Sequence, residues 1–204
     1  MTNRKIAALE TRKKLLEAGK RIICKKGLDN TAVEEITEAA GVSKGTFYTY
    51  FRRKEDIVFE LSRQVFGEFL ENAKQAEGGF LAKLTDYMVN FSGYIEQGGV
   101  KLAQGWVKSV VAPAPEGENS DREKLSSDLA DAEALIRFGI GNGLLKEGAP
   151  AEKLAHTLTD LLYGQMLCWS MSDGDYSLKA RTQEFCDAYL TGMFQDWMVS
   201  KEDV

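Results

Sequence analysis

The stretch that most limits what this chain can fold into is residues 31–54, TAVEEITEAAGVSKGTFYTYFRRK. In its first half, apolar side chains recur at helical spacing, which predicts a short helix with one apolar face. These side chains are Val33, Ile36, Ala39 and Ala40. Thr31 and Glu34 have the spacing of a capping box, which predicts the start of that helix. Gly41 follows the last periodic residue and can adopt the left-handed conformation in which many helices end.

A second short helix is expected immediately after this turn. Ser43 is a favourable N-cap residue for a helix that runs from Lys44 to about Phe51. Phe47 and Phe51 lie four residues apart and are expected to face a core. Lysine and hydroxyl groups occupy much of the remaining surface. A short helix that carries such donors after a glycine turn is typical of a helix whose N-terminal end enters the major groove of DNA.

This pattern resembles the DNA-binding signature of the tetracycline-repressor (TetR) family. The resemblance is carried by Thr31, Val33, Ile36, Ala39-Ala40-Gly41-Val42-Ser43, Gly45-Thr46-Phe47-Tyr48, Tyr50-Phe51 and Lys54, and with the preceding helix it covers about residues 9–60. It implies an all-α fold of about nine helices, with an N-terminal three-helix helix-turn-helix domain and a C-terminal helical domain for ligand binding and dimerisation. The alternative is an ordinary helical hairpin whose tyrosines only fill grooves.

One set of residues is expected to contact DNA, because lysine and hydroxyl groups can reach base edges and tyrosines and backbone amides can hold phosphates. These candidates are Thr31, Ser43, Lys44, Gly45, Thr46, Tyr48, Thr49, Tyr50 and Lys54. Residues 1–65 carry 14 Lys and Arg against 9 Asp and Glu, whereas residues 66–204 carry 12 against 22. This asymmetry fits a basic DNA-binding module on an acidic body, although a solvated basic helix would also produce it.

The predicted domains are a DNA-binding domain over residues 1–53 and a ligand-binding and dimerisation domain over residues 54–204. Within the first domain, apolar periodicity predicts a helix over residues 4–26 that ends at Gly27. A long helix over residues 54–76 links the two domains.

The second domain is expected to consist of further helices. Their predicted ranges are 80–97, 100–111, 120–144, 151–172 and 178–198. Residues 112–120 have the composition of a loop, and Ser120 with Glu123 predicts a second capping box. The last two helices are apolar enough to pair with a second copy of the chain in a four-helix bundle, as the resemblance also implies. The candidate dimer-interface residues are Leu158, Leu162, Phe185, Leu190 and Met193.

Aromatic and flexible side chains are frequent in the C-terminal part of the chain. Such residues can line an apolar pocket between helices, or they can simply fill the core. The resemblance favours a pocket for the group as a whole but not for any one member. The candidate ligand-binding residues are Tyr87, Phe91, Trp106, Phe138, Tyr163 and Met166.

The sequence contains no recognisable catalytic or metal-binding motif. His156 is the single histidine and has no cysteine pair near it, so neither a zinc site nor a catalytic triad is supported. No phosphate-binding or dinucleotide-binding glycine motif is present. The three cysteines are widely spaced, as expected for free thiols in a reducing cytoplasm. No secretory signal or membrane-spanning run is evident, so a cytoplasmic protein is expected. Because no catalytic or metal-binding motif is recognised, we expect that the protein is not an enzyme and needs no cofactor or metal.

These features predict a ligand-responsive transcriptional repressor that binds a near-palindromic DNA operator as a homodimer and is released by a small apolar ligand. The alternatives are an activator or a ligand-independent DNA-binding regulator. A protein of a different class, a small-molecule carrier or enzyme with a vestigial DNA-binding head, is the remaining alternative.

Overall fold

The computed structural model describes residues 3–111 and 120–199, and its named secondary-structure elements are all helices. They are α1 (Asn3–Lys26), α2 (Val33–Ala40), α3 (Lys44–Tyr50), α4 (Glu55–Gln75), α5 (Phe80–Gly98), α6 (Val100–Val111), α7 (Ser120–Gly141), α8 (Ala151–Met171), α9 (Leu178–Phe185), η1 (Cys186–Leu190) and α10 (Thr191–Phe194). Since α9, η1 and α10 follow one another directly, the described chain has nine helical stretches, and the predicted all-α fold is confirmed. An isolated antiparallel bridge joins Leu145 and Met198.

The described residues divide into two compact units. The first unit contains the chain up to Ser62 together with α6, and the second contains residues 63–100 and the chain from Asp121 onward. Helix α4 therefore contributes its first turns to one unit and the remainder to the other. This division differs from the sequence-based domains, which placed α6 and the whole of α4 in the second domain. Residues 112–119 of the predicted loop lie outside the described residues. The side chains of the predicted capping box, Ser120 and Glu123, lie outside them as well.

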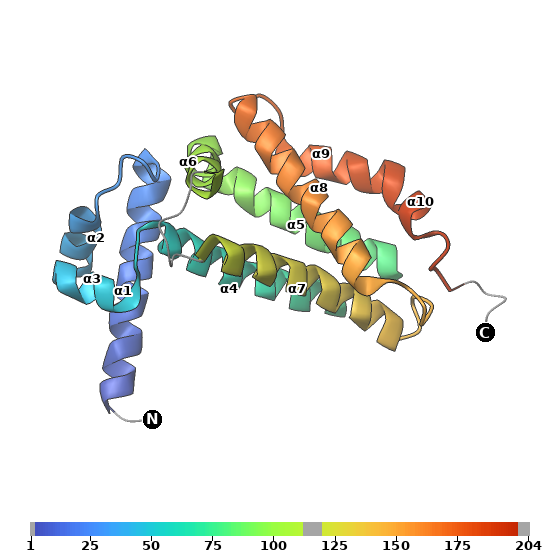
Figure 1. Ribbon diagram of the computed structural model, residues 1–204, viewed down its shortest axis with the longest axis horizontal. Coiled ribbons are helices and arrows are strands. Elements are labelled where there is room, and N and C mark those ends of the chain that lie inside the picture. Colours follow the sequence, from blue (N-terminus) through green and yellow to red (C-terminus); the bar gives the residue numbers. More distant parts are fainter. Residues whose placement is uncertain (1–2, 112–119, 200–204) are drawn as a thin grey trace. The chain divides into compact units, whose positions relative to one another are not determined.

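The first unit is held together by one apolar cluster from α1 to α4. Its buried members are Leu15, Ala18, Ile23, Leu28, Ile36, Phe47, Phe51 and Ile57. Helices α2 and α3 lie beside α1 (Figure 1). Helix α6 also packs on this unit, since Leu102 adjoins the cluster and Lys108 Nζ lies 3.0 Å from Asp29 Oδ2.

The start of α2 differs from the sequence-based prediction. Thr31 is buried, and its hydroxyl donates a hydrogen bond to the Gly27 carbonyl at 2.8 Å. Helix α2 begins two residues later, where the Glu35 carboxylate accepts a hydrogen bond from the Ala32 amide at 2.9 Å. The prediction of a Thr31–Glu34 capping box was therefore wrong. The Thr31 amide also donates to the Leu28 carbonyl at 3.2 Å, so Thr31 closes the turn after α1 and does not cap α2.

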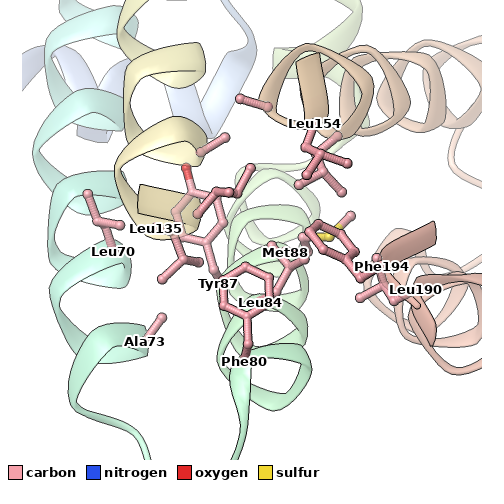
Figure 2. Close-up of a cluster of buried hydrophobic side chains, with 14 of the residues drawn as sticks. Leu70, Ala73, Phe80, Leu84, Tyr87, Met88, Leu135, Leu154, Leu190 and Phe194 are labelled. Carbon is pink, nitrogen blue, oxygen red and sulfur yellow. The ribbon is translucent and has the colours of Figure 1, made fainter. Parts of the chain in front are cut away.

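The second unit has a larger core, with buried side chains from α4, α5, α7, α8, η1 and α10. Figure 2 shows part of this core, where Leu70 and Ala73 of α4 meet Phe80, Leu84, Tyr87 and Met88 of α5, Leu135 of α7, Leu154 of α8, and Leu190 and Phe194 near the C-terminal end. Phe66 of α4 stacks on Phe91 of α5 with 4.1 Å between ring centroids. Pairs of aromatic rings in this geometry stabilise a core beyond the area that they bury.

Helix α7 approaches α5 closely at Gly139. A Cβ atom added at Gly139 would lie 2.5 Å from Cδ2 of Phe80, which is fully buried. Gly67 in α4 has no atom within 4 Å of the same position. The two helical glycines therefore differ in packing.

We expect Gly139→Ala to lower the free energy of unfolding by about 1–3 kcal/mol, because the added methyl group overpacks the core. Gly67→Ala is the matched control and should raise it by about 0.5–1 kcal/mol through helix propensity. Urea denaturation followed by circular dichroism measures both. Stabilisation by both substitutions would contradict the close packing of α7 on α5.

Candidate nucleic-acid interface and effector site

Helix α3 presents two different faces. Phe47 and Phe51 are buried in the first unit, as the sequence predicts. Gly41 has φ 67°, the left-handed conformation expected of it, and the Ser43 side chain caps α3 by accepting a hydrogen bond from the Thr46 amide at 3.1 Å. The opposite face of α3 is exposed and carries Lys44, Gly45, Tyr48 and Thr49, while Thr46 and Tyr50 are half-buried.

The polar groups of this outer face differ in whether they are already hydrogen-bonded within α3 and its cap. The Ser43 and Thr46 hydroxyls lie 2.8 Å apart, and the Thr49 hydroxyl donates to the Gly45 carbonyl at 3.1 Å. Tyr48 is 51% exposed, and Lys44 is exposed at the first position of α3. Lys44 and Tyr48 are thus the donors best placed to reach a macromolecular ligand.

The Lys44 ammonium forms an ion pair with the Glu34 carboxylate of α2. The hydrogen bond to Lys44 lowers the pKa of Glu34, and the same contact raises the pKa of Lys44. Both side chains are more than half exposed, with relative accessibilities of 54% for Lys44 and 61% for Glu34. A phosphate or base edge that binds Lys44 therefore competes with Glu34.

Lys54 has a structural position. Its ammonium donates hydrogen bonds to the carbonyl oxygens of Leu28 at 2.5 Å and Thr31 at 3.0 Å, and it lies 3.3 Å from that of Asp29. It thereby binds the connection between α1 and α2. Since the Thr31 side chain is buried, its interpretation as a DNA contact is corrected here. Lys54 is half-buried, and its contact with DNA stays a prediction. The signal that sequence reasoning missed is that the carbonyl groups after the end of α1 need donors.

A shallow groove beside α3 contains, besides Tyr50, residues of α1 that the sequence analysis did not list as candidates. It is lined by Lys5, Ala8, Leu9, Arg12 and Tyr50, so an apolar wall lies between basic side chains. Leu9 is 57% exposed, and the Arg12 guanidinium lies 2.7 Å from the Glu60 carboxylate. Such a groove is suited to a sugar–phosphate backbone, which presents apolar carbons and charged oxygens together.

The predicted ligand-binding residues do not all belong to one unit. Tyr87, Phe91 and Met166 are buried in the second unit, and Phe138 and Tyr163 are half-buried there. Trp106 is buried on α6, which belongs to the first unit.

Charged side chains are buried beside these aromatic residues. Lys124 is 7% exposed and Asp128 is 4% exposed, with 2.6 Å between Lys124 Nζ and Asp128 Oδ2. The Tyr163 hydroxyl donates to the same Asp128 oxygen at 2.6 Å. Burial, together with the charge of Asp128, raises the pKa of Asp131 from 3.8 to about 6. Burial, with the charges of Asp131 and Asp128, also raises the pKa of Tyr87.

The residues predicted at a dimer interface are mostly internal. Leu158, Leu162 and Leu190 are buried in the core of their own unit, so their assignment to an interface is corrected. Phe185 and Met193 are partly buried against that core.

A different face of the last helices is uncovered. Leu161, Gly164, Leu167, Cys168 and Met171 share one side of α8, where Leu167 is 42% and Met171 78% exposed. Tyr189 in η1 is 62% exposed, and its ring lies 5.3 Å from that of Phe185. Exposed apolar side chains gathered in this way mark an interaction surface.

The described residues contain no group of three His, Cys, Asp or Glu side chains that could hold a metal ion. His156 is exposed on α8. None of the helices in the described ranges combines the length and apolar character needed to cross a membrane.

Comparison with known proteins finds similarity to bacterial regulators. Residues 15–61 match the family described as "Bacterial regulatory proteins, tetR family". Over 181 residues the chain is 23% identical to the Fatty acid metabolism regulator protein of Bacillus subtilis, covering 88% of this chain and 93% of the relative. It is 33% identical to the HTH-type transcriptional regulator AcrR of Shigella flexneri over 87 residues, which cover 41% of this chain and 40% of AcrR.

Two solved structures share the fold. The transcriptional regulator FadR from Bacillus subtilis, in complex with stearoyl-CoA, aligns with a TM-score of 0.66 and 23% identity over 89% of this chain and 98% of its own. Thermus thermophilus FadR, described as a TetR family transcriptional repressor in complex with lauroyl-CoA, aligns with a TM-score of 0.72 and 19% identity over 93% and 96%.

Asp131→Asn is expected to stabilise the protein at about pH 8 by about 1 kcal/mol, a value reduced because Asp131 is only half-buried and partly screened by solvent. The folded state raises the pKa of Asp131, so the stability contributed by this group is present below about pH 4 and lost as the pH rises through about 6. Asparagine stays neutral, and its advantage should therefore vanish towards pH 4. Urea denaturation across this range, with exposed Glu147→Gln as control, measures the effect. A gain that does not depend on pH would contradict it.

Proposed function

Because the chain is a TetR-family transcriptional regulator, we propose that it is a repressor that binds a near-palindromic DNA operator as a homodimer and that a small apolar effector releases it. The observation that carries this proposal is the division of α3 into a buried phenylalanine face and an exposed face with Lys44 and Tyr48. A rigid helix of this kind can present its N-terminal side chains to the major groove.

On DNA, the exposed face of α3 would lie in the major groove and its flanks would contact the backbone. Lys44 is placed to reach a base edge or phosphate once it leaves Glu34, and the Tyr48 hydroxyl is placed to donate to a phosphate oxygen. The groove that contains Lys5 and Tyr50 would receive the adjoining sugar–phosphate backbone. The helix contains no arginine, so bidentate recognition of guanine by α3 is not part of this proposal.

The dimer would form through the uncovered faces of α8 and the C-terminal helical stretch. Gly164 lies near the middle of the exposed α8 face and allows a second helix to approach closely. A two-fold axis through this surface would present two copies of α3 to two half-sites of an operator.

The effector would bind in the second unit, whose interior is rich in aromatic side chains. A relative named for fatty acid metabolism, and similar structures solved with stearoyl-CoA and lauroyl-CoA, make long-chain acyl thioesters the first effectors to test. An effector that binds the free dimer better than the DNA-bound dimer shifts the population away from the operator. Turnover of a small molecule without any DNA binding would instead favour the carrier or enzyme alternative.

Lys44→Ala and Tyr48→Phe are expected to weaken operator binding, each by about 1–3 kcal/mol if the lost contact is to a base edge and by less if it is to a phosphate. Glu34→Gln should strengthen binding, because it releases Lys44 and removes a negative charge near the phosphates. The operator is first selected from random DNA, and affinities are then measured by fluorescence anisotropy. Lys146→Ala, which removes a charge from an exposed loop of the second unit, is the control. Equal affinities for all variants would contradict the assignment of α3.

Leu167→Glu combined with Met171→Glu is expected to yield a folded monomer at micromolar concentration, because two charges would enter the proposed interface. Its operator affinity should fall by about ten-fold or more, since one head cannot bind both half-sites. Sedimentation velocity measures the oligomeric state. The control is Leu125→Glu, which adds a charge at a 41% exposed leucine of α7. A wild-type monomer, or a doubly substituted dimer, would refute this interface.

An effector of the proposed kind should bind the free protein about 5–150-fold more tightly than the operator complex. Calorimetric titration of stearoyl-CoA into the free protein and into the protein–operator complex measures both affinities. By linkage, the effector must lower operator affinity by the same factor. Identical effector affinities in the two titrations would remove the ligand switch and leave the proposed DNA binding in place.

A further inference from the structure

We propose that the second unit contains a binding site for an organic ammonium ion and that the ammonium group of Lys124 occupies this site in the absence of a ligand. The site is formed by side chains of three helices: Asp128 of α7, Tyr163 of α8 and Phe66 of α4. This inference goes beyond the proposed function, which names an apolar effector and acyl thioesters but no cationic ligand.

The geometry around Lys124 Nζ is that of a cation cage. Asp128 Oδ2 lies 2.6 Å from the nitrogen, and the ring centroids of Phe66 and Tyr163 lie 5.0 and 5.8 Å from it. The Tyr163 hydroxyl donates to Asp128 at 2.6 Å and so holds the carboxylate in place. A carboxylate combined with aromatic faces is the chemistry by which proteins recognise organic ammonium ions.

This ion pair is more deeply buried than a contact that only stabilises a helix needs to be. Lys124 and Asp128 lie four residues apart on α7, and such pairs form readily on exposed helix surfaces. Here the pair is more than nine-tenths buried under Phe66 and Tyr163. Burying an ion pair is a poor source of stability, because desolvation offsets the attraction between the charges. A binding role explains why the carboxylate and both rings converge on one cation.

The surroundings favour a cation with an apolar body. Asp131, one turn after Asp128, adds a second carboxyl group beside the site. Phe66 stacks on Phe91 at 4.1 Å, and both rings are buried, so the side of the cage formed by Phe66 is apolar. A carboxylate attracts organic ammonium ions in general and aromatic faces attract quaternary ones in particular, whereas a carboxylate ligand of equal length would face Asp128 and Asp131.

Lys124 is suited to being a displaceable occupant. It lies in the second turn of α7, and its flexible four-carbon chain can carry the ammonium to solvent when a ligand enters. The incoming cation then replaces the charge of Lys124 beside Asp128, so the buried carboxylate is never left without a partner.

The first test is chemical rescue of Lys124→Ala. This substitution removes three carbons and the ammonium group, which n-propylammonium replaces. We expect the variant to melt at a lower temperature than wild type, and n-propylammonium chloride to raise its melting temperature relative to sodium chloride of equal ionic strength. Sodium butyrate, an anion of similar size, should give no rescue, and neither should n-propylammonium added to Lys124→Ala combined with Asp128→Asn. Equal rescue by butyrate, or rescue that persists without the Asp128 carboxylate, would overturn the proposal.

The second test uses the wild-type protein and hexyltrimethylammonium. Calorimetry should detect binding to wild type, roughly ten-fold tighter binding to Lys124→Ala because the competing ammonium is gone, and no binding of hexanoate. If Lys124→Ala does not fold, Phe66→Leu keeps the ion pair and must bind the quaternary ammonium more weakly than wild type. Absence of binding to folded wild type, or unchanged affinity in Phe66→Leu, would refute the site. No DNA is present, so neither outcome depends on operator binding.

Discussion

The inward packing of Phe47 and Phe51 is the constraint on which the DNA-binding unit depends. Both rings are buried among side chains of α1, α2 and α4, so α3 cannot rotate about its own axis without exposing them. The opposite face is thereby fixed outward, and with it Lys44 and Tyr48. A hydrophobic contact thus sets which polar groups are available for recognition, and hydrogen bonds within α3 decide which of them remain to donate outward.

The local parts of this arrangement could be predicted from the sequence. Gly41, Ser43 and the phenylalanine spacing act within one or two helical turns, where periodicity and capping rules apply directly. Thr31 and Lys54 could not be placed in the same way. Their positions depend on the turn after α1 and on carbonyl groups more than twenty residues away from Lys54, and such tertiary contacts leave no periodic trace in the sequence.

The second unit shows the same limit in a different form. The apolar stripes of α8 could be recognised from the sequence, but periodicity alone does not say which stripe the chain covers with its own core. Leu158 and Leu162 turned out to be inside, whereas Leu167 and Met171 are outside. The Lys124–Asp128 pair looks like an ordinary surface pair in the sequence, and only the positions of Phe66 and Tyr163 on other helices reveal its burial.

The ion pair between Glu34 and Lys44 has a consequence for how the proposed operator binding responds to salt. A lysine that is free in solution attracts anions, whereas Lys44 is already neutralised by a carboxylate of its own chain. When a phosphate replaces Glu34 at Lys44, one intramolecular partner is exchanged for an intermolecular one. The carboxylate that is released must then recruit a cation from solution. At this position, the cation that the DNA releases is offset by the cation that Glu34 takes up. Lys44 would therefore raise operator affinity while contributing little to the dependence of that affinity on salt concentration.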